Sequence, residues 1–290
     1  MTISRPGDFL ALTKPRITCF ILMSTAIGFV CGMNAGTAWT WVTLLHTLLG
    51  TALIASGTAA LNQWYERDAD AKMNRTMARP IPSGRVTGPH ALIFGIILSV
   101  AGFLDLWLGA NPLTAMLGFF TLASYLFLYT PMKQRSPHST TLGAIPGAMP
   151  PLIGFAAASG TLNWDAWILY AILFLWQFPH FYAIAWMYRA DYARAGILML
   201  PVVEPDGEST SRRMLWFSLA LLPISLLPKF FAMAGNFYLA GALVLGLIYA
   251  YASLRSVFDC SVTRARQVLL ASVLYLPFLY GLLVLDRVRY

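Results

Sequence analysis

The chain has 290 residues, of which 58% are hydrophobic and only 11% charged, and its mean hydropathy is +0.65. Ordinary soluble proteins carry about 25% charged residues, so this composition excludes a typical soluble globular protein. The net charge of +8 comes without a basic run interleaved with aromatic residues, so it indicates no nucleic-acid partner. The three cysteines are widely spaced and indicate neither a disulfide framework nor a metal site.

Nine apolar stretches are long enough to cross a bilayer as helices, which takes about 17–25 residues each. They cover about 17–36, 41–64, 91–110, 112–130, 139–160, 165–188, 214–232, 234–256 and 266–285. The fifth stretch is rich in Gly and Pro, which favours a broken or closely packed helix whose freed backbone groups are satisfied by its neighbours. The sequence therefore predicts an all-α integral membrane protein with a single polytopic domain over residues 1–290.

The basic residues divide unequally between the two sides that nine spans define. One side receives the N-terminus and the loops after every second span, and it holds 17 of the 20 Lys and Arg residues; the other side holds Lys229, Arg287 and Arg289. Lys and Arg concentrate in the cytoplasmic loops of membrane proteins. The distribution predicts a cytoplasmic N-terminus and an external C-terminus, and it directs the search for function to the cytoplasmic loops.

The second span leads into the charged segment "LNQWYERDADAKMNRTMARPIPSG", residues 61–84. Asn62, Glu66 and Asp70 follow one another at intervals of four, so a helix that continues out of the span places all three on one face. Carboxylates this close repel each other unless a cation lies between them. Mg²⁺ suits such a place, because it takes one or two carboxylates together with phosphate oxygens.

Three basic residues, Lys72, Arg75 and Arg79, follow the acids and offer donors suited to phosphate oxygens. Acids for a metal beside bases for phosphate predict a Mg²⁺–diphosphate site. The alternative interpretation is a solvated face at a helix end, which is the ordinary role of mixed charges beside a membrane span.

The segment "NQWYERDADAKMNRTMARP" resembles the first signature of the UbiA-type membrane prenyltransferases, an Asn-Asp-x₂-Asp-x₃-Asp pattern on a helix that ends in a cytoplasmic loop. Gln63 stands where that pattern has Asp, and Glu66 replaces its middle Asp. This form, followed by "DAKMNRT" and "RP", resembles the haem branch of the superfamily, the protohaem IX farnesyltransferases. Further matching segments follow in order, among them "LTKPRIT", "YTPMKQRSPHSTTLGAIPGAMPPLIGF" and "WQFPHFYAIAWMYRADYARAGILMLPVVEPDGEST".

The resemblance implies nine transmembrane helices around a central cavity. It implies transfer of a farnesyl group from farnesyl diphosphate to the 2-vinyl group of haem b, giving haem O. Asn62, Glu66 and Asp70 would hold Mg²⁺ and the diphosphate, with the three basic residues that follow them nearby. The resemblance also implies a place in the bacterial cytoplasmic (inner) membrane with the active site facing the cytoplasm, and a link to haem A synthase or to terminal oxidase assembly.

The second signature of the superfamily is an Asp-x₃-Asp pattern after the sixth span. The corresponding segment here, "WMYRADYARAG", supplies only Asp191, which places a second set of Mg²⁺ ligands in doubt. Arg189 and Arg194 flank this acid, and we expect them to neutralise part of the charge of the leaving diphosphate.

Haem iron commonly takes an axial His, and a polar side chain inside a span is more often functional than not. His180, late in the sixth span, is therefore the candidate haem ligand or orienting donor. His138 is a candidate for binding a haem propionate together with Lys133 and Arg135. We expect His46 and His90 to be packing or interface residues.

Aromatic faces stabilise a farnesyl cation by cation–π attraction. The candidates are Trp64, Tyr65, Tyr182, Trp186 and Tyr188, although Trp and Tyr are enriched at membrane interfaces in any case. Three other functions stay open: a prenyltransferase acting on an aromatic or quinone precursor, a transporter, and a non-catalytic haem carrier. Transporters place ionisable groups near the bilayer midplane, whereas the acids here gather at one face. A carrier would keep His180 without needing the Glu66 and Asp70 pair.

Overall fold

The computed structural model describes residues 5–33 and 39–288, and within them nine helical segments are long and apolar enough to span a membrane. Seven of these segments are single helices: α2 (Pro15–Gly32), α3 (Trp41–Tyr65), α5 (Gly88–Gly109), α10 (Trp164–Met187), α13 (Glu208–Phe230), α14 (Asn236–Phe258) and α15 (Val262–Leu285). The other two are the run of α6 (Pro112–Ala123), η1 (Ser124–Tyr129) and α7 (Thr130–Met132), and the pair α8 (Ser139–Gly147) and α9 (Pro150–Ser159). The predicted fold class and the number of spans are confirmed.

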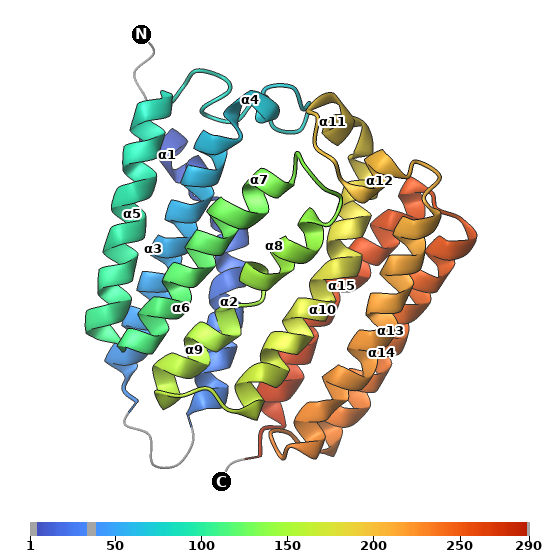
Figure 1. Cartoon of the computed structure of the whole chain (residues 1–290). Coiled ribbons are helices and arrows are strands. Elements are labelled where there is room, and N and C mark those ends of the chain that lie inside the picture. Colours follow the sequence, from blue (N-terminus) through green and yellow to red (C-terminus); the bar gives the residue numbers. More distant parts are fainter. Residues whose placement is uncertain (1–4, 34–38, 289–290) are drawn as a thin grey trace.

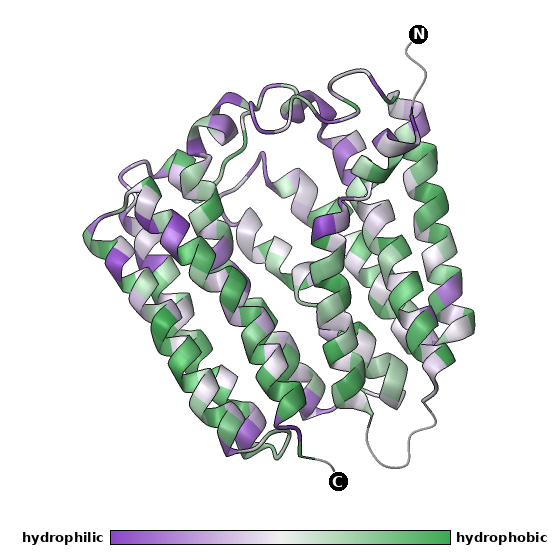
Figure 2. Ribbon diagram, turned by 180° about the vertical axis from the view of Figure 1, so that it is seen from behind, coloured by the Kyte–Doolittle hydropathy of each residue, from purple (hydrophilic) through white to green (hydrophobic). Residues whose placement is uncertain are grey.

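The long helices lie side by side, and the short elements gather at one end of the bundle (Figure 1). These are α1 (Pro6–Leu12), α4 (Arg67–Asp70), α11 (Arg189–Arg194) and α12 (Leu200–Val203). We call this the loop-rich end. The N-terminal part of the chain begins there, and the C-terminal part ends at the opposite side, as an odd number of spans requires. Hydrophilic residues concentrate at the loop-rich end, whereas the long helices are mostly hydrophobic (Figure 2).

Large apolar side chains cover the outside of the bundle. Leu108, Phe127 and Phe258 each expose at least three quarters of their surface. Exposed apolar area of this extent marks contact with a membrane or a partner, and helices satisfy their own backbone hydrogen bonds, which a lipid environment demands. The chain is an integral membrane protein.

The fifth span is broken between α8 and α9, as its composition predicted. Pro150 and Pro151 begin α9, and proline cannot donate the backbone hydrogen bond that would continue α8. The span also packs tightly, because a Cβ on Gly154 would collide with the carbonyl oxygen of Thr25, and one on Gly28 with that of Pro151. The crossing of α2 and α9 therefore depends on glycine at both positions.

The fourth span contains a π-helical segment, η1, that the sequence analysis did not predict. Pro131 has no N–H for the normal helical bond, and the backbone N–H and hydroxyl of Thr130 both donate to the carbonyl of Tyr125 instead. Short π-helical segments occur frequently at functional sites. Here the segment brings Tyr125 and Tyr129 together, with ring centroids 4.9 Å apart.

Candidate active site

A group of charged and amide side chains lies at the loop-rich end, where α3, α4, the start of α2 and the end of α7 meet. Its members are Lys14, Asn62, Glu66, Asp70, Arg79 and Lys133, and we call them the charged cluster. Helical spacing continues across the break at Glu66, because Glu66 N donates to Asn62 O over 2.9 Å and Asp70 N to Glu66 O over 2.8 Å. Asn62, Glu66 and Asp70 therefore keep the common face that the sequence predicted, and Asn62 and Asp70 are buried.

Each acid of the charged cluster is paired with a base from another segment. Lys133 Nζ lies 2.8 Å from Glu66 Oε1, and Arg79 Nη1 lies 2.7 Å from Asp70 Oδ2. Burial alone would raise the pKa of Glu66, but the charge and hydrogen bond of Lys133 outweigh it and hold that pKa below its usual value. Burial alone would lower the pKa of Lys133, yet Glu66 holds it well above the ordinary value. The pair is therefore ionised on both sides.

Lys14 joins the charged cluster from the segment before α2, a position that the sequence analysis counted only as an orientation charge. Its Nζ lies 3.4 Å from Asn62 Oδ1, and withdrawal from water, followed by the positive charges of Arg79 and Lys133, lowers its pKa to about 7. Its backbone is left-handed (φ 49°, ψ 61°), which costs a non-glycine residue about 1–3 kcal/mol. The signal available in the sequence was a lysine directly before the proline that opens a span.

Gln63 fixes the turn that carries Lys14. Its side-chain amide donates to the carbonyl of Leu12 over 2.8 Å, and it is buried. A carbonyl needs a donor, which an ionised aspartate does not have. Gln63, which stands where the superfamily pattern has Asp, thus joins α3 to the chain before α2 through a hydrogen bond and adds no acid to the charged cluster.

Tyr125 and Tyr129 form an aromatic row that the sequence analysis missed. Lys133 Nζ lies 4.5 Å from the centroid of the Tyr129 ring, and the hydroxyl of Thr130, next along the chain, accepts a bond from Asn62 Nδ2 over 3.3 Å. A Cβ on Gly143 would come within 2.6 Å of the Tyr129 ring, so glycine is needed there to admit the ring. The quoted segment "YTPMK" carries all of these residues, but the π-helical geometry that aligns them is not visible in the sequence.

The aromatic residues named from the sequence mostly contact arginines. Trp64 lies beneath Arg67 with 5.5 Å between guanidinium and ring centroid, and Trp186 beneath Arg189 with 4.3 Å. Tyr182 accepts a bond from Arg213 over 3.3 Å, whereas Tyr65 is exposed.

Asp191 connects the two charged loops, the first being residues 66–87 between α3 and α5 and the second residues 188–207 between α10 and α13. This buried carboxylate accepts the backbone N–H of Arg75 over 3.1 Å at Oδ2, and Arg194 binds its other oxygen. The guanidinium of Arg75 lies over the rings of Tyr188 and Tyr192, 5.0 and 5.8 Å from their centroids. Asp191 thus holds the segment after α4 against α11.

Of the basic residues predicted to contact diphosphate, only Arg79 lies in the charged cluster. Lys72 is exposed. Arg189 donates to the Trp186 carbonyl over 2.9 Å and stacks on that ring, while Arg75 and Arg194 are engaged around Asp191. The cations that accompany Arg79 are Lys14 and Lys133, neither of which was assigned to diphosphate.

His180 lies on α10 beside α15, seven residues before α10 ends at Met187. Its Nδ1 is 2.8 Å from Ser272 Oγ, and the Ser272 hydroxyl donates to the Leu269 carbonyl over 2.6 Å. Because that hydroxyl proton is used, His180 Nδ1 is the donor in its bond, and Nε2 keeps the lone pair that a metal requires. The ring stacks on Trp176 with centroids 4.9 Å apart.

The other three residues considered for haem do not form one group. Lys133 is buried in the charged cluster, whereas His138 and Arg135 are exposed at the surface. Lys133 pairs with Glu66 and does not share a surface group with His138 and Arg135, so the joint contact of the three residues with a haem propionate stays a prediction.

Within the described part of the chain, no three His, Cys, Asp or Glu side chains come together as a metal cluster. The divalent-metal site predicted from the sequence instead combines the amide of Asn62 with the two carboxylates of Glu66 and Asp70. These residues fit a divalent metal ion, because Asp70 Oδ1 is buried and has no hydrogen-bond partner among the described residues. An amide and two carboxylates also provide the oxygen ligands that Mg²⁺ prefers.

Fold and site together define a polytopic membrane protein with a buried polar centre at one end of an apolar bundle. The chain belongs to the UbiA prenyltransferase family, whose model matches residues 21–282. It is 60% identical to the protoheme IX farnesyltransferase of Solibacter usitatus (strain Ellin6076), over 97% of this chain and 98% of that protein. It is 45% identical to the protoheme IX farnesyltransferase of Koribacter versatilis (strain Ellin345), over 99% and 97%. The resemblance noted in the sequence is confirmed.

Solved structures share the fold at low sequence identity. A digeranylgeranylglyceryl phosphate synthase aligns with a TM-score of 0.79 and 16% identity over 97% of both chains. A UbiA homologue from Archaeoglobus fulgidus, bound to GPP and Mg²⁺, aligns with a TM-score of 0.70 and 15% identity over 96% of this chain and 99% of that one. At these identities the likeness shows the fold alone.

Proposed function

We propose that this protein transfers the farnesyl group of farnesyl diphosphate to the 2-vinyl group of haem b, giving haem O. The observation that carries the proposal is the charged cluster, which places three cations and an unpartnered carboxylate oxygen at the end of an apolar bundle. Relatives named protoheme IX farnesyltransferase at up to 60% identity support haem as the acceptor.

Asn62, Glu66 and Asp70 would hold Mg²⁺, with Asp70 Oδ1 as the oxygen already free to bind it. The ion, when bound, acts as a Lewis acid on the diphosphate. Support for a divalent metal comes from the Archaeoglobus fulgidus homologue, which binds GPP together with Mg²⁺.

Lys14, Arg79 and Lys133 are the cations that receive the diphosphate. As the C–O bond of the allylic diphosphate breaks, negative charge grows on the leaving oxygens, and fixed positive charges stabilise it most effectively where water is excluded. Arg79 and Lys133 also neutralise Asp70 and Glu66. Among the residues that the structure describes, Lys14 Nζ bonds to the neutral amide of Asn62 and to no carboxylate, so its charge is the one left for the substrate.

Tyr125 and Tyr129 line the approach of the farnesyl carbon. Each aromatic face is worth about 0.5–2 kcal/mol to a nearby cation, and the two rings meet edge to face next to Lys133. The two rings stabilise the carbocation and, unlike a carboxylate, are not strong nucleophiles that would react with it. The apolar remainder of the farnesyl chain extends between the helices.

His180 is the candidate contact for haem, since the bond from Nδ1 to Ser272 leaves Nε2 available to iron. The vinyl group supplies the electron pair for the new C–C bond, and water then adds a hydroxyl to the resulting cation and releases a proton. His138 and Arg135, exposed at the loop-rich end, are candidates for a propionate.

The predominance of basic residues at the loop-rich end supports a cytoplasmic position for the charged cluster. In a bacterium this corresponds to the inner membrane, where haem A synthase or a terminal oxidase assembly pathway would use the product.

The test uses purified protein in detergent with haem b, farnesyl diphosphate and Mg²⁺, and follows the mass of the haem. We expect a gain that corresponds to a hydroxyethylfarnesyl group and that is lost when the metal is chelated. Tight haem binding without a mass change would indicate a haem carrier. Prenylation of a phenolic acid in place of haem would indicate an enzyme for aromatic precursors.

A further inference from the structure

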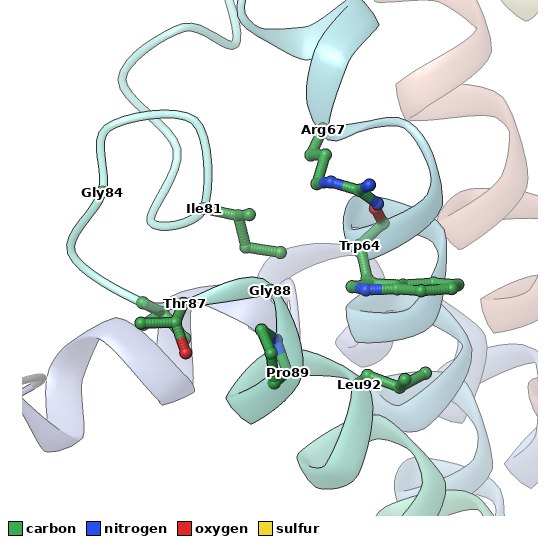
Figure 3. Close-up of a pocket in the computed structure, with 9 residues that line it drawn as sticks. Trp64, Arg67, Ile81, Gly84, Thr87, Gly88, Pro89 and Leu92 are labelled. Atoms are coloured by element: carbon green, nitrogen blue, oxygen red, sulfur yellow. The ribbon is translucent and has the colours of Figure 1, made fainter.

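A cavity of about 600 Å³ opens beside the end of α3, between residues 81–87 and the start of α5 (Figure 3). Trp64, Ile81, Val86, Pro89 and Leu92 form its apolar walls, and Arg67 lies at its upper side. Residues 64 and 67 occupy the side of the helix opposite to residues 62 and 66. The cavity is therefore separate from the charged cluster.

The cavity lies at the level where the apolar spans end. The spanning helix α3 ends at Tyr65, and the next one, α5, begins at Gly88. Its walls thus belong to the boundary between hydrocarbon and headgroups, where an amphipathic molecule from the bilayer meets both an apolar surface and a charge.

Arg67 provides a fixed cation at this boundary. Its Nη1 donates to the Trp64 carbonyl over 2.8 Å, and its guanidinium lies over the Trp64 ring, while 42% of the side chain stays exposed. The nearest acid, Asp68, is 4.0 Å from Nε and 86% exposed. Nη2 has no hydrogen-bond partner among the described residues, and a planar guanidinium suits a phosphate group.

We propose that this cavity binds one anionic phospholipid, with its headgroup phosphate on Arg67 and an acyl chain against Trp64 and Leu92. The apolar walls require a hydrocarbon body, the guanidinium requires an anion, and the membrane supplies both in one molecule. Lipid binding at this cavity does not depend on the transfer reaction. A lipid held here would brace residues 71–86, which carry Arg75 and Arg79 to their partners.

Native mass spectrometry of the delipidated full chain in detergent tests this, with phosphatidylglycerol, phosphatidylcholine and soluble glycerol 3-phosphate as separate probes. Two variants address the two halves of the site. Arg67→Gln removes the cation, and Gly88→Leu fills the cavity, since a Cβ at Gly88 meets only the Trp64 indole at an ordinary 3.7 Å. Arg212→Gln is the matched control, because Arg212 is an exposed arginine paired with Glu208 outside the cavity.

We expect wild type and Arg212→Gln to retain one phosphatidylglycerol at about ten-fold lower lipid concentration than phosphatidylcholine. Arg67→Gln should lose this preference, and Gly88→Leu should lose the bound lipid. Equal retention of phosphatidylglycerol by Arg67→Gln and wild type, or by Gly88→Leu and wild type, would overturn the proposal. Displacement of the lipid by glycerol 3-phosphate alone would also overturn it, because the site would then recognise a soluble anion.

Discussion

The two charged loops at the loop-rich end use their residues in opposite ways. Around α4, Asn62, Glu66 and Asp70 point into the protein and find partners far away in the sequence, at Lys14 and Lys133 as well as at Arg79. Around α11, the single acid Asp191 takes a partner three residues away, and Arg189 stacks on Trp186. The first loop gathers positive charge from the residue before α2 and the residue after α7 as well as from its own Arg79, whereas the second finds most of its partners within itself.

The two loops are therefore suited to unequal roles in the proposed reaction. Burying opposite charges together is favourable only where hydrogen bonds satisfy the remaining donors and acceptors. In the first loop, Asp70 Oδ1 and the Lys14 ammonium lack some of the hydrogen-bond partners that they could take. Those unsatisfied groups suit a metal and a diphosphate. The second loop contributes a clamp, through the bond from Asp191 to the Arg75 backbone.

The strongest way to test the comparison is to remove the acids of the first loop. We expect Glu66→Gln and Asp70→Asn to lower turnover by about 10²–10³-fold or more, the range for losing a preorganised electrostatic group. The haem mass assay measures this, and size-exclusion chromatography in detergent verifies that each variant is folded. Asp68→Asn is the matched control, because Asp68 is 86% exposed. Near-normal turnover in both variants would show that these acids do not serve the reaction.

Lys14 tests whether the first loop depends on a partner from outside it. Lys14→Met keeps the length of the side chain but removes its charge, and we expect farnesyl diphosphate to bind and react about 10²-fold less well. Lys14→Arg, which keeps the charge, should retain more activity than the Met variant. Equal activity of wild type and Lys14→Met would assign the diphosphate to Arg79 and Lys133 alone.

The same lysine makes stability depend on pH in an unusual direction. Its pKa is 10.5 in an unfolded chain and about 7 in the fold, so between these values the unfolded chain binds more protons and wild-type stability rises with pH. Lys14→Met lacks this dependence. We expect the variant to be more stable than wild type at pH 6 and the difference to shrink by pH 10, as measured by Tm in detergent. A difference that does not change with pH would contradict the lowered pKa.

Hydropathy and charge were sufficient to predict nine spans, because a bilayer imposes length and polarity on every helix that crosses it. The common face of Asn62, Glu66 and Asp70 was also predictable, since helical spacing alone fixes it. The partners were not. Lys14 reaches Asn62 and Lys133 reaches Glu66 only after α2 and η1 pack against α3. The Tyr125–Tyr129 row needs a π-helical segment that depends on the hydrogen bonds around Pro131.

A smaller effect is expected when the clamp in the second loop is removed. Asp191→Asn gives up the charge that binds Arg194 and weakens the acceptor of the Arg75 N–H. We expect about ten-fold slower turnover, which corresponds to about 1.4 kcal/mol of activation free energy. Hydrogen exchange should become faster in residues 71–79. Arg189→Gln, which leaves Asp191 untouched, should change neither. If Asp191→Asn were as damaging as Asp70→Asn, the two loops would be equal partners and the comparison would fail.

The smallest effect on turnover is expected at His180, which neither charged loop contacts through its ring. His180→Ala should leave farnesyl diphosphate binding unchanged, weaken haem binding about ten-fold, and slow turnover only a few-fold at saturating haem, since about 1.4 kcal/mol of binding free energy corresponds to that factor. The Soret band of bound haem is the deciding measurement, because loss of an axial imidazole changes it whereas a change in packing alone does not. Ser272→Ala is the matched variant: it removes the acceptor of the Nδ1 proton but keeps Nε2, so it should shift the haem reduction potential and retain the ligand. An unchanged spectrum in His180→Ala would remove His180 from the haem site and leave the first loop as the part of the molecule that the reaction requires.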